Sequence, residues 1–223
     1  MVKVIAFDVN ETLLDLGGLD PTFEEVFGDA ALRPQWFAQM LQLSFVGGLT
    51  GNYVDFGTAQ RAALRMIAQR HDRPLGNDQI DRVIDAMSHL PPHPEVSDAL
   101  AELAATELTV VALTNSVQSV VEAQLSNAGI RHHFDRAFSA DAVGHLKPAP
   151  QPYEAVAAAY RVEMDELRLV AAHAWDVSGA LAAGSKAAFV ARPGMVLSPL
   201  GAQPDIVGDD IRDVVDQIIR TDT

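Results

Sequence analysis

Short apolar runs rich in β-branched residues alternate along the chain with segments of helical period. The runs, at residues 2–7, 108–113, 134–139, 167–172 and 187–190, are predicted to be strands. Helical patterns follow most of them, at residues 96–105, 117–127, 151–160, 177–183 and 211–219. Because strands that alternate with helices form parallel sheets covered on both faces, the pattern predicts an α/β, Rossmann-like three-layer core.

The segment between residue 14 and about residue 91 departs from this alternation. It contains helical patterns at residues 35–45, 54–69 and 77–87 and no convincing strand. We therefore predict an all-helical cap at residues 16–92, inserted into a core made of residues 1–15 and 93–223. The expected joints are Gly17 and Gly18 on one side and the Pro-Pro-His-Pro stretch at 91–94 on the other, because glycine permits and proline restricts backbone geometry. Residues 220–223 are expected to fray.

Charge and composition narrow the range of functions. Sixteen basic and 30 acidic residues leave a formal net charge of −14, which argues against nucleic acid or an anionic membrane as the main partner. The chain has no cysteine, which excludes disulfides, thiolate metal sites and cysteine nucleophiles. The first predicted strand begins at residue 2 and no apolar run approaches membrane-spanning length, so a cytoplasmic protein is expected.

Several polar residues fall at the ends of different predicted strands, where parallel sheets present reactive groups. They are Asp8, Thr12, Thr114, Asn115, Ser116, His173 and Asp176, and Lys147 lies in a loop before a helix. Each has a structural alternative: Asp8 suits the end of a strand, while Thr114 and Asp176 suit helix caps. Together, however, they favour a site at the carboxyl edge of the sheet.

Four ordered motifs, FDVNET, LTNS, HLKPAPQPY and AHAWDVSGA, resemble those of the haloacid dehalogenase superfamily of hydrolases. The resemblance covers nearly the whole chain. Within the superfamily the chain is most similar to the 2-haloacid dehalogenases, whose fourth motif has the AWD pattern and whose lysine loop carries a tyrosine, here Tyr153.

The resemblance implies a hydrolytic dehalogenase that needs no metal or cofactor and converts a 2-haloalkanoic acid into a 2-hydroxyalkanoic acid and halide. Asp8 would attack the carbon that bears the halogen and form an ester, which water then hydrolyses. Lys147 would keep Asp8 ionised, Asp176 would position the water, and Thr12 would orient Asp8. The expected substrate-binding residues are Thr114, Asn115, Tyr153, Asn10, His173 and Phe37.

Two alternatives stay open at this point. A magnesium-dependent phosphatase of the same superfamily would need a second acid two residues after Asp8, where this chain has Asn10, which cannot act as a carboxylic acid. A non-catalytic binding protein of the same fold is the other alternative. The joint presence of Asp8, Lys147 and Asp176 favours an enzyme.

Two positions differ from the pattern of the 2-haloacid dehalogenases. Phe37 stands where those enzymes carry a cap arginine that receives the halide, and it cannot supply a positive charge. Arg33, one helical turn earlier, is a candidate replacement. His173 stands where asparagine is common and could handle water, bind the leaving group or satisfy the end of its strand. The sequence leaves the oligomeric state open, with a homodimer through the apolar cap helices as one alternative.

Overall fold

The core of the protein is one parallel sheet of six strands. The computed structural model describes residues 1–223, and the strand order across the sheet is β3-β2-β1-β4-β5-β6. The strands are β1 (Val4–Phe7), β2 (Thr109–Thr114), β3 (Arg136–Ser139), β4 (Leu167–Ala171), β5 (Lys186–Val190) and β6 (Ile206–Gly208). Every neighbouring pair is parallel. The first strand of the chain therefore lies in the middle of the sheet, between β2 and β4.

Helices cover both faces of the sheet and complete the three layers. The helices α5 (Val96–Leu103), α6 (Gln118–Asn127) and α9 (Ile211–Asp222) pack on one face, and α7 (Pro150–Tyr160) and α8 (Ala174–Ala182) pack on the other. Side chains of β1 alternate between the two cores: Ile5 and Phe7 join the first, and Val4 and Ala6 the second. The α/β three-layer prediction is confirmed.

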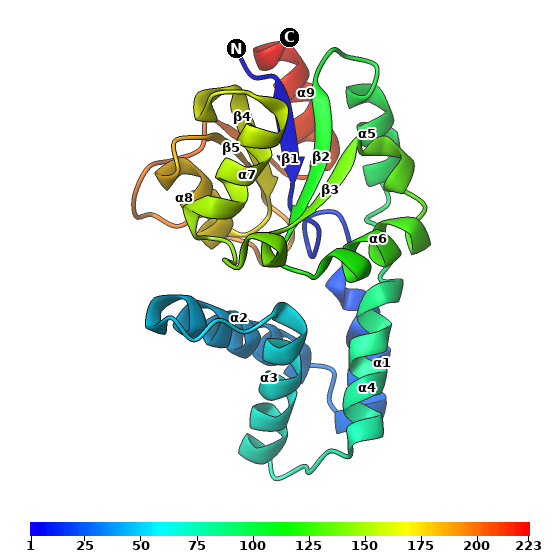
Figure 1. Cartoon of the computed structure of the whole chain (residues 1–223). Coiled ribbons are helices and arrows are strands. Elements are labelled where there is room, and N and C mark those ends of the chain that lie inside the picture. Colours follow the sequence, from blue (N-terminus) through cyan, green and yellow to red (C-terminus); the bar gives the residue numbers. More distant parts are fainter.

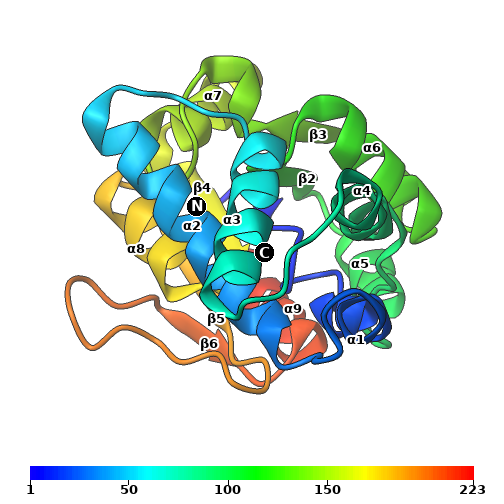
Figure 2. The same ribbon diagram turned by 90° about the horizontal axis from the view of Figure 1, so that it is seen from below.

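Four helices between β1 and α5 form the cap: α1 (Asp20–Phe27), α2 (Leu32–Thr50), α3 (Phe56–Arg70) and α4 (Asn77–Ala86). Helices α2 and α3 lie below the carboxyl edge of the sheet, and both termini lie at the opposite edge (Figure 1). Seen from below, these two helices cross in front of that edge (Figure 2). Trp36 of α2 donates its indole N–H to the carbonyl of Gln60 in α3, at 3.1 Å, which joins the two helices. All four helices fall within the predicted cap, whose limits stay a prediction.

The structure differs from the sequence-based expectations at four points. Helix α1 and strand β6 were not expected, and α8 begins at Ala174 rather than at residue 177. The C-terminal residues do not fray, because α9 continues to Asp222, whose buried carboxylate accepts hydrogen bonds from Arg168 at 2.7 and 3.1 Å. No helix of the structure has both the length and the apolar character that a membrane crossing requires.

Candidate active site

Asp8 follows β1 directly and lies at the carboxyl edge of the sheet with 5% of its surface exposed. Its backbone N–H continues the sheet by donating to the carbonyl of Val170 in β4. Its Oδ1 accepts a hydrogen bond from Lys147 Nζ at 2.9 Å. Its Oδ2 accepts one from Thr12 Oγ1 at 2.7 Å and faces His173 Nδ1 at 3.1 Å. The two oxygens of the carboxylate therefore have different surroundings.

Lys147 is fully enclosed and uses all three donors of its ammonium group. Besides Asp8, Nζ contacts Asp176 Oδ2 at 2.5 Å and the carbonyl of Leu113 at 2.8 Å. Asn115 holds the lysine loop, residues 144–149, in register: its Oδ1 accepts from Lys147 N at 2.8 Å, and its Nδ2 donates to Lys147 O at 3.1 Å. A charge without access to water requires such complete pairing, because an unpaired buried ammonium is costly.

Asp176 lies in the first turn of α8, where the helix dipole favours a negative charge. Its Oδ2 faces Lys147, and its Oδ1 accepts a hydrogen bond from the Tyr153 hydroxyl at 2.5 Å. Asp176 and Tyr153 are both fully buried. Lys147 thus forms ion pairs with two carboxylates, those of Asp8 and Asp176.

These contacts decide the protonation states. Burial alone would raise the pKa of Asp8, but Lys147, His173 and Thr12 together hold it well below its usual range. Burial would lower the pKa of Lys147, yet the two carboxylates raise it above its ordinary value. Burial and the negative charge of Asp8 raise the pKa of Asp176 against the opposing effect of Lys147. Asp8 is therefore the ionised carboxylate that a nucleophilic role requires.

A small cavity of about 10 Å³ adjoins the Asp8 carboxylate, room for about one water molecule. The residues that line it are Asp8, Asn10, Phe37, Phe56, Thr114, Asn115, Lys147, His173 and Trp175. Core and cap both contribute, since Phe37 comes from α2 and Phe56 from α3. Five of the six expected substrate-binding residues, all except Tyr153, therefore line one cavity with Asp8.

The position of Tyr153 differs from the expectation: it lies behind Asp176 and does not line the cavity. Thr12 and Asp176 are also off the cavity wall. Thr12 instead bridges Asp8 to the next strand, because its Oγ1 accepts a hydrogen bond from Ala172 N at 2.9 Å. Asn10 lines the cavity while its Oδ1 accepts a hydrogen bond from Gln124 at 2.9 Å.

An aromatic stack separates the cavity from a pocket of about 370 Å³ on its outer side. The His173 ring is stacked between Phe37 and Trp175, with ring centroids 5.6 and 5.2 Å apart. These three residues line both spaces. Phe37 thus contributes a flat apolar surface to the cavity, and its side chain supplies no positive charge there.

Glu11 is a site residue absent from the predictions. Its Oε2 lies 2.7 Å from His173 Nε2, and its Oε1 lies 3.9 Å from Nη1 of Arg33 in the cap. Burial alone would lower the pKa of His173, but the hydrogen bonds to Asp8 and Glu11 raise it to about 9. The only sequence signal for Glu11 is that an acidic residue follows Asp8 in the turn. Acidic residues are also common in exposed turns, so this signal is not specific.

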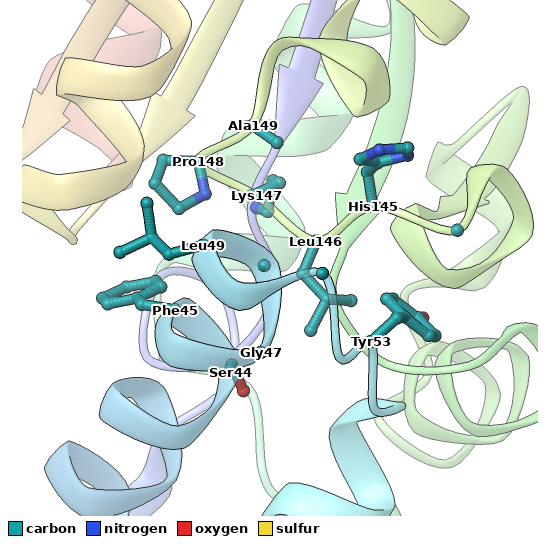
Figure 3. Close-up of a pocket in the computed structure, with 13 residues that line it drawn as sticks. Ser44, Phe45, Gly47, Leu49, Tyr53, His145, Leu146, Lys147, Pro148 and Ala149 are labelled. Carbon is teal, nitrogen blue, oxygen red and sulfur yellow. The ribbon is translucent and has the colours of Figure 1, made fainter.

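A larger pocket of about 590 Å³ lies between the C-terminal end of α2 and the lysine loop. Figure 3 shows Phe45 and Leu49 of α2 beside it, with Leu146 and Pro148 of the loop. Asp8 is not part of its lining. The small cavity is therefore the space that adjoins Asp8, although the larger pocket adjoins the same lysine loop.

The site contains no group of three or more His, Cys, Asp or Glu side chains arranged to hold a metal ion. The two carboxylates at its centre, Asp8 and Asp176, are instead bridged by the ammonium group of Lys147. The positive charge between them thus comes from the chain itself.

Replacing Gly179 of α8 by Ala is expected to destabilise the protein by about 1–3 kcal/mol, because overpacking forces neighbouring groups to shift. A Cβ atom there would lie 2.5 Å from Pro148 Cβ and 2.8 Å from the Tyr153 hydroxyl. Chemical denaturation measures the change. Gly48→Ala is the matched control, because a Cβ on that helical glycine meets nothing within 4 Å. Equal stability of the Gly179→Ala variant and the parent would contradict the close packing.

The chain is similar in sequence to known proteins. The family model of haloacid dehalogenase-like hydrolases matches residues 2–184. The chain is similar to an (S)-2-haloacid dehalogenase of Pseudomonas sp. (strain YL), with 30% identity over 96% of this chain and 94% of that protein. It is also similar to haloacetate dehalogenase H-2 of Moraxella sp. (strain B), with 26% identity over 92% of each chain.

A solved structure shows the same similarity in three dimensions. It is the L-2-haloacid dehalogenase of Xanthobacter autotrophicus with chloropropionic acid covalently bound. Its sequence is 25% identical to this chain, the match covers 100% of both chains, and the TM-score is 0.92.

Proposed function

The chain belongs to the haloacid dehalogenase-like hydrolases, and we propose that it hydrolyses the carbon–halogen bond of a small (S)-2-haloalkanoic acid through an ester on Asp8. The observation that carries the proposal is the buried Asp8 carboxylate, whose Oδ1 has Lys147 as its one hydrogen-bond donor. The names of the similar proteins support the choice of substrate.

In the first step, Oδ1 of Asp8 attacks the carbon that bears the halogen. The new bond joins Oδ1 to that carbon, and the carbon–halogen bond breaks with its electron pair leaving on the halide. Oδ1 is the better nucleophile of the two oxygens, because Thr12 and His173 both occupy Oδ2. Lys147 keeps the carboxylate ionised until it reacts.

In the second step, water attacks Cγ of the Asp8 ester, and its proton passes to Asp176. Collapse of the tetrahedral intermediate breaks the Cγ–Oδ1 bond, so the product leaves with Oδ1 as its hydroxyl oxygen, protonated by Asp176. The raised pKa of Asp176 suits a group that accepts and returns a proton. Tyr153 and Lys147 hold the Asp176 carboxylate in place for this exchange.

A haloacid is larger than the single water molecule that the cavity of about 10 Å³ can hold. We therefore infer that the substrate enters when the cap or the stack of Phe37, His173 and Trp175 moves and enlarges this space. Closure then excludes bulk water from the ester until the second step. The alternative of a magnesium-dependent phosphatase is not favoured, because Asn10 provides no second acid and Lys147 bridges the two carboxylates.

The test is halide release from chloroacetate and from each enantiomer of 2-chloropropionate, with and without a chelator. We expect release from the (S) enantiomer and from chloroacetate, slower release from the (R) enantiomer, and no effect of the chelator. Absence of release from all three compounds, or release that requires added Mg²⁺, would contradict the proposed function.

A further inference from the structure

The turn that follows Asp8 contains a residue in an unfavourable backbone conformation. Glu11 has φ +63°, in the left-handed region, where glycine is favoured and a side chain is strained. The other two non-glycine residues with positive φ, Asp72 and Arg161, lie at helix ends, where this conformation is common. Strain at a functional site persists when the surrounding contacts hold the residue in place, so the contacts of Glu11 are informative.

The Glu11 carboxylate connects the catalytic core to the cap. Oε2 lies 2.7 Å from Nε2 of His173, and Oε1 lies 3.9 Å from Nη1 of Arg33 in α2. The other ring nitrogen of His173 lies 3.1 Å from Asp8 Oδ2. A histidine that faces a carboxylate through each ring nitrogen donates through both, which only the charged imidazolium can do.

His173 and Thr12 meet at the same oxygen of Asp8. Thr12 Oγ1 lies 2.7 Å from Oδ2, and the hydroxyl is itself fixed by the backbone N–H of Ala172. When Oδ1 has formed the ester, Oδ2 is its carbonyl oxygen. It is also the atom that takes the negative charge when water adds to Cγ, so these donors are aimed where charge develops.

We propose that Glu11 is a positioning residue for ester hydrolysis, holding His173 as an imidazolium so that His173 and Thr12 together stabilise the oxyanion that forms on Asp8 Oδ2. The inference rests on the proposed function, because it concerns the second step of that reaction. Water adds to Cγ, the π electrons of the Cγ–Oδ2 bond move onto Oδ2, and collapse restores that bond as the Cγ–Oδ1 bond breaks.

The charged groups around His173 determine how the protonation of its ring depends on pH. Asp8 and Glu11 face its two nitrogens, Lys147 lies on the other oxygen of Asp8, and Arg33 lies near the other oxygen of Glu11. His93 reaches only the backbone carbonyl of Glu11, and burial together with Arg192 lowers its pKa. The aromatic neighbours Phe37 and Trp175 carry no charge. Loss of the Glu11 carboxylate therefore removes one of the two negative groups that keep His173 protonated.

Two variants separate positioning from a merely structural role. Glu11→Gln keeps the shape of the side chain and removes its charge. Glu11→Gly removes the side chain and relieves the backbone, because glycine accepts a positive φ without strain. Glu102→Gln is the matched control, since this exposed glutamate of α5 forms its ion pair with Arg212, away from the site.

The experiment follows halide and the Asp8 ester in the same rapid-quench samples, the ester by mass spectrometry, with (S)-2-chloropropionate as substrate. In both Glu11 variants we expect a halide burst of about one equivalent per site at the parental rate, followed by turnover slowed by about 10- to 100-fold. The ester should accumulate in these variants and remain scarce in the parent and in Glu102→Gln. The upper pH limit of turnover should fall by about one unit or more, because less of His173 is protonated.

Nuclear magnetic resonance titration of the His173 ring, assigned with His173→Asn, measures its pKa without turnover. Parental ester lifetimes in both Glu11 variants, or a slower burst without ester accumulation, would overturn the inference while leaving the proposed function intact. An unchanged His173 pKa in both variants would also overturn it. Absence of any halide release by the parent would instead refute the proposed function, and the ester step with it.

Discussion

Replacing Asp8 by Asn is expected to lower halide release by at least about 10⁴-fold, because loss of a nucleophile removes the whole covalent route. The carboxamide has nearly the same shape as the carboxylate but cannot displace a halide. No aspartyl ester should be detectable at this position by mass spectrometry. Halide release under saturating substrate is the primary measurement.

The control for this prediction is a check that the Asp8→Asn variant is still folded. Asn keeps one oxygen that can accept the hydrogen bond from Lys147, and its NH2 group takes the place of Oδ2 beside Thr12, so far-ultraviolet circular dichroism should match the parent. Asp8→Ala, which removes both oxygens, should be equally inactive. Substantial activity in either variant would show that another group attacks the substrate, and the proposed ester on Asp8 would be wrong.

Replacing Lys147 by Met is expected to destabilise the protein by about 3–5 kcal/mol, because removal of one partner leaves a buried charge uncompensated. Here two carboxylates, Asp8 and Asp176, lose their shared cation at once. One of them must then take up a proton, since two buried carboxylates in one site do not both stay ionised. Halide release should fall by about 10³-fold, comparable to the loss of a strong electrostatic contact. Urea denaturation and halide release measure the two effects.

Lys186→Met is the matched control for a lost lysine. The Lys186 side chain is 39% exposed and its ion pair with Asp222 is 3.8 Å long, so stability should change by no more than about 1 kcal/mol. Adding Asp176→Asn to Lys147→Met should restore part of the lost stability by removing the second buried charge. A Lys147→Met protein as stable as the parent would refute the assigned charge pairing.

The fold was largely predictable because its signals are local. Five of the six strands are apolar runs, and helical periodicity follows them at 3.6 residues per turn. The two missed elements are short: α1 has eight residues and β6 has three. Strand β6 lies at the edge of the sheet, where pairing with β5 decides its conformation more than its own sequence does.

The candidate site was predicted only in part. The order of residues shows which side chains follow strands and loops, but not which of them meet in the folded chain. Asp8, Lys147 and Asp176 lie in recognisable strand-end and loop motifs. In the structure both carboxylates contact the ammonium group of Lys147. Tyr153 was expected at the substrate, but the packing of α7 against α8 turns it toward Asp176. Glu11 could not be assigned from its neighbours in the chain, since its partner His173 lies 162 positions away.

The sequence by itself determined the alternation of strands and helices, the helical segment after the first strand, the family resemblance, and Asp8 with Lys147 as the candidate nucleophile and its cation. These features depend on residue types and spacings within short segments of the chain. Only the tertiary structure decided which oxygen of Asp8 each donor reaches, that Phe37 stacks on His173, and that Glu11 joins His173 to the cap. Such contacts bring together residues distant in sequence, and they are set by how the cap packs against the sheet edge.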